Sequence, residues 1–121
     1  MNTYTIIHKN GKTYLECLPE MKPISSESDA LDLVALCGEE ETQRLMLYAE
    51  HLSPAFFDLI SGLAGQILLK FANYRIKAVL IASPEQVGTG RFAEMAMESN
   101  RFNQFGVFFA RAEAEQWLLR D

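Results

Sequence analysis

The chain has 121 residues, and its 11 basic and 16 acidic side chains give a net charge of -5. Hydrophobic residues make up 49% of it and charged residues 22%, which is typical of a globular protein and excludes a disordered one. A chain of this size buries about two-thirds of its surface, enough for one core but not for two. We therefore expect a single domain over residues 1–121. Because no basic run occurs, no nucleic-acid partner is expected.

The two cysteines and the N-terminal residues indicate the cellular compartment of the protein. Cys17 and Cys37 lie in apolar stretches without Cys-x-x-Cys spacing, which predicts buried thiols in a reducing environment. The first residues have neither the basic start nor the apolar stretch of a signal peptide. No apolar run approaches the roughly 20 residues of a membrane span. The sequence predicts a cytoplasmic protein that does not contact a membrane.

The first half of the chain alternates strand-like and helix-like segments. Two strand-like runs, Tyr4 to His8 and Lys12 to Cys17, flank Asn10-Gly11, a pair typical of tight hairpin turns. A helix is expected to begin at Ser28-Asp29 and to end at Gly38. Leu45 to Tyr48 is apolar without alternation, as in a strand covered on both faces.

The segment from Ser53 to Tyr74 predicts one long amphipathic helix. Ser53 is a suitable N-cap, and Pro54 occupies the first helical position, where a backbone N–H would have no partner within the helix. Apolar residues then recur at helical spacing, at Phe56, Ile60, Leu63, Ile67 and Phe71.

The second half continues the alternation. A buried strand at 78–82, a loop at 83–89, a helix at 91–99 and a strand at 107–110 are followed by a short helix. The apolar face of that last helix consists of Ala114, Trp117 and Leu118. The predicted order is β-β-α-β-α-β-α-β-α. It indicates an α/β domain with a mixed, mostly parallel five-stranded sheet.

Two segments resemble a known family. The run from Phe56 to Gly65, continued by Lys70 to Arg75, is similar to the bacterial domain-of-unknown-function 4180 family. Asp29 to Leu33 is similar to the first helix of that family. The resemblance covers nearly the whole chain and implies a small bacterial protein with no assigned activity.

The element order also resembles the STAS domain, the fold of the anti-sigma-factor antagonists. In that fold a helix opens with a motif such as Asp-Ser-Ser-Gly-Leu, and phosphorylation of one hydroxyl switches partner binding. The run from Asp58 to Leu63 is similar but one residue longer, and Ser61 is its only hydroxyl. The resemblance implies that Ser61 could accept phosphate.

The candidate site is the corner between Glu50 and Ser61. Glu50 and His51 follow the strand that ends at Tyr48, and open α/β sheets bind ligands at the carboxyl ends of strands. His51 is either an acid or base in that corner or a surface loop histidine. The amides after Ser53 could hold an anion. The candidate binding or switch surface is Glu50, His51, Ser53, Asp58 and Ser61.

Asp58 and Ser61 also have structural interpretations. Asp58 lies near the first turn of the expected helix, where a carboxylate is stabilising. The Ser61 hydroxyl could instead bond a backbone carbonyl one turn earlier.

No catalytic residue, metal ligand set or cofactor motif is expected. The glycine-rich run at 88–90 lacks the lysine of a phosphate-binding loop. Two functions stay open: a non-enzymatic regulatory or protein-interaction module, and a binder of an anionic metabolite, or a weak enzyme, using the same corner.

Self-association is expected from the strand pattern. Both faces of the sheet are apolar, and the resemblance to the STAS fold implies that the four helices are unevenly shared between them. We expect a homodimer through the thinly covered face or through the region of Phe92, Phe102 and Phe105. Core packing is the alternative for those three rings.

Overall fold

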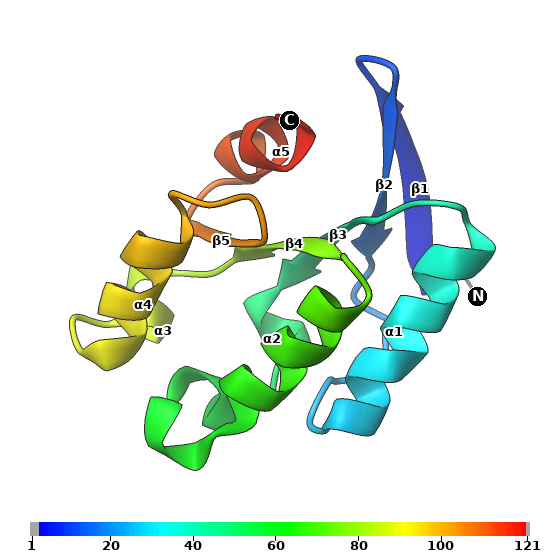
Figure 1. The fold of residues 1–121 in the computed structure, drawn as a ribbon. Helices are drawn as coiled ribbons and strands as arrows, with labels where there is room; N and C mark the ends of the chain where they lie inside the picture. The colour runs from blue at the N-terminus through cyan, green and yellow to red at the C-terminus, as the bar shows by residue number, and fades with distance from the viewer. Residues whose placement is uncertain (1–2, 121) are drawn as a thin grey trace.

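The computed structural model describes residues 3–120, and its strands form one sheet in the order β1-β2-β3-β4-β5 (Figure 1). The first pair of strands is antiparallel and the other three pairs are parallel. The strands are β1 (Tyr4–Lys9), β2 (Lys12–Cys17), β3 (Arg44–Tyr48), β4 (Lys77–Ile81) and β5 (Phe105–Phe108). The predicted fold class, a single small α/β domain with a mixed, mostly parallel sheet, is confirmed.

The helices are shared unevenly between the two faces of this sheet. In Figure 1, α1 (Glu27–Glu39) and α2 (Leu63–Asn73) lie below the sheet, and α5 (Arg111–Leu119) lies above it. The side chains of α4 (Arg91–Ser99) belong to the same core as those of α1 and α2. Parallel strands in sequence order, joined by right-handed connections, place every connecting helix on one face. Only α5, which follows the last strand, can cover the other face.

Two cores result from this arrangement. Buried residues of the first core include Leu45, Leu47 and Leu80 with Ile67 and Phe71. Met46 and Val79 point to the opposite face, where they pack against Ala114, Trp117 and Leu118. The prediction that both faces of the sheet are apolar, and the apolar face predicted for the last helix, are confirmed.

The cysteines lie in the first core. Cys17 and Cys37 are both fully buried and form no disulfide. Burial raises the pKa of each thiol to about 12. Their predicted role as core residues is confirmed.

The single long helix expected from Ser53 to Tyr74 is wrong. Two short 3-10 helices, η2 (Pro54–Phe57) and η3 (Leu59–Ser61), precede α2. Gly62 then turns the chain at a φ of 80°, a left-handed conformation that glycine adopts without strain. Helical hydrophobic spacing continues through this segment, but the side chains of Asp58 and Ser61 bond nearby backbone groups and divide the helix.

Smaller differences have local causes as well. A short helix, α3 (Pro84–Val87), lies in the expected loop because Ser83 and Gln86 cap each other's backbone amides. Strand β5 begins and ends two residues earlier than expected. The hairpin turn is confirmed, with positive φ values at Asn10 and Gly11.

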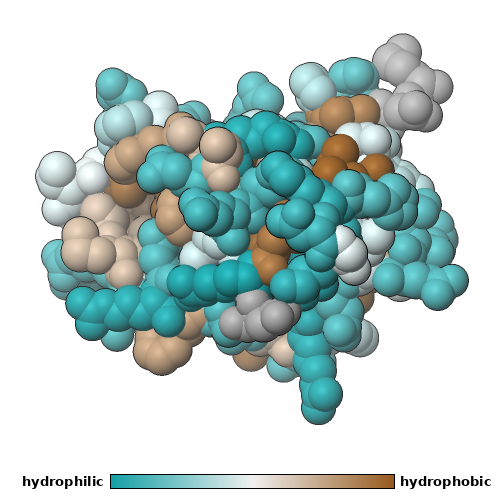
Figure 2. All heavy atoms as spheres, turned by 90° about the horizontal axis from the view of Figure 1, so that it is seen from above, coloured by the Kyte–Doolittle hydropathy of each residue, from teal (hydrophilic) through white to brown (hydrophobic). Residues whose placement is uncertain are grey.

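The face covered by α5 is not a broad apolar surface. Seen from above, that side of the molecule is mostly hydrophilic, with small separate hydrophobic patches (Figure 2). Of the three rings considered for association, Phe92 and Phe105 are buried and only Phe102 is exposed. Within residues 3–120, none of the helices combines the length and apolar character that a membrane span needs.

Candidate functional site

The carboxyl ends of β3, β4 and β5 meet at one edge of the sheet and leave a cleft there. The register places Tyr48 beside Ile81 and Ile81 beside Phe108, so the chain leaves three neighbouring strands at the same level. The cleft has a volume of about 280 Å³, and its lining includes Tyr48, Glu50, Ile81, Ser83, Gln86 and Phe109. Open α/β sheets bind their ligands at this position.

A second and more apolar cleft lies on the other side of Phe109. Its volume is about 390 Å³, and its apolar lining includes Val87, Ala93, Ala96, Met97 and Val107. The side chains of Phe109 and Met97 are 58% and 71% exposed. We call the residues that line either cleft the Phe109 surface. Large apolar side chains that stand this far out of the core beside two clefts are typical of an interaction site.

The charge around the Phe109 surface is acidic. Glu50 lines the first cleft and Glu113 the second. A neighbouring hollow beside Met97 adds Glu94, Glu98 and Arg101. The Arg101 Nη1 atom lies 3.9 Å from Glu98 Oε2, so this guanidinium already faces a carboxylate. The rim therefore holds more carboxylates than cations.

The other polar groups of the first cleft have structural roles. The Ser83 hydroxyl accepts a hydrogen bond from the Gln86 amide at 3.2 Å, and Gln86 Oε1 accepts one from the Ser83 amide at 2.8 Å. These bonds start α3. The charged groups that line the two clefts are carboxylates.

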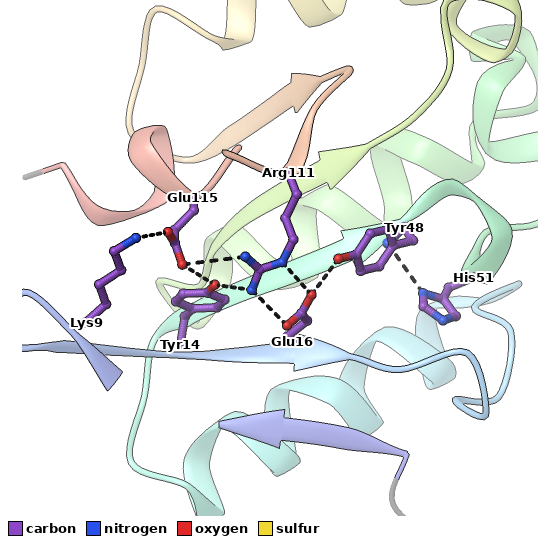
Figure 3. A network of polar contacts seen from close by, with 7 residues as sticks. All are labelled: Lys9, Tyr14, Glu16, Tyr48, His51, Arg111 and Glu115. Carbon is purple, nitrogen blue, oxygen red and sulfur yellow. Dashed lines mark hydrogen bonds and ion pairs between the residues drawn. The ribbon is translucent and has the colours of Figure 1, made fainter. Parts of the chain in front are cut away.

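A polar network lies next to the first cleft, between α5 and the sheet (Figure 3). At its centre, Arg111 holds Glu16 with two hydrogen bonds of 3.0 Å, from Nε to Oε2 and from Nη2 to Oε1. Tyr48, which lines the cleft, donates its hydroxyl to the same Glu16 carboxylate. Arg111 Nη2 also donates to the Tyr14 hydroxyl at 2.9 Å, which donates in turn to Glu115 at 2.6 Å. These contacts join β2, β3 and α5.

The network holds its groups in fixed protonation states at neutral pH. The hydrogen bonds from Arg111 keep the pKa of Glu16 below its usual range. A hydrogen bond from Lys9 does the same for the pKa of Glu115. Burial, together with the bond to Glu16, raises the pKa of Tyr48 to about 12, and burial also raises the pKa of Tyr14. The same hydrogen bonds hold α5 against β2 and β3.

The predicted site residues do not form one cluster. Glu50 is exposed and lines the cleft at the strand ends, where the sequence placed it. Ser53 caps η2 by accepting from the Ala55 amide at 3.3 Å, and Asp58 caps η3 by accepting from the Ile60 amide at 3.1 Å. None of Ser53, Asp58 and Ser61 lines the Phe109 surface.

Ser61 has the structural role considered for it. Its Oγ lies 2.7 Å from the carbonyl oxygen of Asp58, one turn earlier, and 2.6 Å from that of Ala55. The side chain is exposed. The predicted bond to a carbonyl one turn earlier is confirmed.

The interpretation of His51 as a surface loop histidine is wrong. The residue is only 2% exposed, because η1 (Ala49–His51) turns its ring into the molecule. Its Nε2 lies 2.8 Å from the carbonyl oxygen of Leu18, and its Nδ1 lies 3.4 Å from the backbone nitrogen of Tyr48. A carbonyl only accepts, so Nε2 carries the proton and Nδ1 accepts. With both nitrogens in use, His51 ties the loop after β2 to the end of β3.

An anion site at Ser53 gains no support from the local structure. The segment that follows is a four-residue 3-10 helix, and the Ser53 hydroxyl already takes the Ala55 amide. A helix this short lacks the aligned dipoles that attract an anion. Among the described residues, no group of three or more His, Cys, Asp or Glu side chains is placed to hold a metal ion.

Sequence reasoning missed most of the Phe109 surface and the whole polar network. One local signal was present, because Tyr14 and Glu16 alternate with Leu15 and Cys17 and so share the face opposite the first core. Arg111 and Glu115 are also four apart, on one side of α5. Nothing in the sequence links the two pairs, which lie about a hundred residues apart.

Comparison with known proteins places the chain in a family without defining an activity. No curated protein and no solved structure matches it significantly, so the resemblance to the STAS fold stays a prediction. The model of one family, described as a domain of unknown function (DUF4180), matches residues 9–118. That range is nearly the whole chain, and the protein therefore belongs to the DUF4180 family.

Proposed function

We propose that this protein is a non-enzymatic protein-interaction module and that the Phe109 surface is its docking site. The partner is a peptide segment with an apolar centre and flanking Lys or Arg residues. The observation that carries the proposal is the pairing of exposed Phe109 and Met97 with two clefts under an acidic rim.

The geometry supports a large side chain of the partner in each cleft. Apolar walls on both sides of Phe109 supply the desolvated contacts that dominate binding energy in protein interfaces. Glu50 and Glu113 then face the flanks of the bound segment, where Lys or Arg complements their charge. The same carboxylates disfavour the alternative ligand, an anionic metabolite.

The experiment is a selection from a random-peptide display library against the whole protein, followed by calorimetry on the selected peptides. We expect apolar sequences with basic flanks, whose affinity falls with added salt. Phe109→Ser should weaken binding about tenfold or more, as truncation of a central anchor does.

Leu69→Ser is the matched control. Leu69 is 57% exposed against 58% for Phe109, but it lies on α2 in a different hollow. Its substitution should leave the affinity unchanged. Selection of acidic peptides, or equal sensitivity to both substitutions, would overturn the proposal.

A further inference from the structure

The two edge strands of the sheet, β5 and β1, differ in whether their outward backbone groups have hydrogen-bond partners. On the outer side of β5, the Asn100 amide bonds the backbone of Val107 in both directions. Its Oδ1 accepts from the Val107 amide at 2.7 Å, and its Nδ2 donates to the Val107 carbonyl at 2.9 Å. The Asn100 backbone is held in turn by Trp117 Nε1, which donates to its carbonyl at 3.0 Å. The Asn100 side chain therefore blocks the pairing of another strand at Val107, a protection that edge strands commonly have in proteins that avoid unwanted pairing.

Among the described residues, no side chain is seen to bond the outward backbone groups of β1 in this way. The amide of Leu18 donates to the carbonyl of Thr3, so Thr3 and Leu18 form a hydrogen-bonded pair of the hairpin. This pair determines which of the following pairs are also hydrogen-bonded. Bonded and non-bonded pairs alternate in an antiparallel ladder, so the backbone groups of Tyr4, Ile6 and His8 point away from β2. Among the described residues no strand lies on that side. The register runs from Tyr4 to Lys9 without a bulge or a proline.

We propose that β1 pairs antiparallel with β1 of a second copy of this chain, with the two-fold axis at Ile6. In this register Tyr4 of one copy lies opposite His8 of the other, and the two Ile6 residues face each other. The three outward residues of each strand form about six hydrogen bonds in total. The two sheets become one continuous sheet with β5 at both ends.

Hydrogen-bonding side chains at the seam favour a second copy as the occupant. The Tyr4 hydroxyl donates to Glu40 at 2.6 Å, which fixes the acidic end of α1 beside the start of β1. Residues 39–41 are all glutamates, and Glu39 and Glu41 are exposed. The exposed His8 of the second copy arrives on the same face as Tyr4, so the histidine meets the carboxylates across the seam. A two-fold axis makes this contact twice.

Pairing at the β1 edge would form a dimer without the need for an exposed apolar face of the sheet. The α5 side of the molecule is mostly hydrophilic (Figure 2) and needs no cover from a partner. The pairing edge and the Phe109 surface belong to different strands, so a dimer leaves the proposed docking site open. The proposal therefore stands or falls independently of the proposed function.

The test is light scattering coupled to size exclusion on the whole protein over a range of micromolar concentrations. We expect twice the 13.7 kDa chain mass at the upper end. His8→Pro should give 13.7 kDa particles, because proline removes an outward amide that β2 does not use. His8→Thr keeps that amide and loses only the side-chain contact with the glutamates, so it should still form a dimer, at higher protein concentration than the wild type. A wild-type mass of 13.7 kDa throughout, or a dimer that persists in His8→Pro, overturns the proposal.

Hydrogen exchange of the wild-type protein gives a second readout that needs no variant. The amides of Tyr4, Ile6 and His8 should exchange about tenfold or more slowly at high than at low concentration. Amides that already bond across the hairpin, such as that of Ile7, should change little. Exchange at the three outward amides that does not depend on concentration overturns the proposal even if His8→Pro fails to fold.

Discussion

Replacement of Arg111 by Met tests whether the polar network anchors α5. The substitution keeps a long aliphatic side chain and removes both bonds to Glu16, whose side chain is 11% exposed. Loss of one partner from a buried ion pair costs about 3–5 kcal/mol. Arg111 is 44% exposed, so water screens the pair, and Tyr48 still donates to Glu16. We therefore expect a loss of about 1–3 kcal/mol in the free energy of unfolding.

The loss should depend on pH in a defined direction. Arg111 lowers the pKa of Glu16 in the folded protein, so the pair stabilises the fold above the ordinary carboxyl pKa. That contribution is lost as the pH falls through the folded pKa, which lies lower still. The difference in the free energy of unfolding between wild type and Arg111→Met should be largest at neutral pH and should decrease below about pH 4.5.

Urea unfolding followed by circular dichroism measures these differences. Arg91→Met is the matched control, because Arg91 is also the first residue of its helix, is exposed, and has no ion pair among the described residues. It should change the free energy of unfolding by less than about 0.5 kcal/mol. Adding Glu16→Gln to Arg111→Met should restore part of the stability, since no unpaired charge is then buried. A loss that is equal at neutral and acidic pH, or no recovery in the double variant, would refute the reasoning.

Three further predictions concern packing and the loop before α2. A Cβ atom on Gly106 would lie 3.0 Å from ring carbons of Trp117, so Gly106→Ala should lower the free energy of unfolding by about 1–3 kcal/mol in urea titrations. Gly65 lies on an exposed turn of α2 with open space around a new Cβ, so Gly65→Ala should raise the free energy of unfolding by about 0.5–1 kcal/mol. A change of the same sign in both glycine variants contradicts the packing argument. Ser61→Ala removes the hydroxyl bonded to the Ala55 and Asp58 carbonyls and should cost about 0.5–1 kcal/mol by the same measurement; unchanged stability would mean that the hydroxyl does not hold the loop.

Local chemistry made parts of the fold predictable. Asn10 and Gly11 reach positive φ easily, so the hairpin could be placed from two residues. Apolar runs located β3 and β4, and helical spacing identified the buried face of α5. In each case the residues that determine the structure are neighbours in the chain.

The segment between Ser53 and Gly62 shows where that reasoning fails. Its apolar spacing is helical, yet Ile60 is 83% exposed, because side-chain bonds and a left-handed glycine interrupt the helix before α2. Periodicity reports which residues could share a face, but not whether a polar side chain competes for the backbone. The candidate site had the same limit, since only Glu50 of its residues lies at the cleft.

The exposure of Phe109 follows from the geometry on both sides of it. Phe108 faces α5, where its ring centroid lies 6.0 Å from that of Trp117, so strand alternation directs the next side chain away from that core. The connection to α5 is only two residues long, and Glu16 holds the first residue of α5 against the sheet. Phe109 therefore cannot fold back under the helix, and the opposite side offers it only the walls of the two clefts. The polar network that fixes α5 thus also fixes the position of the residue on which docking depends.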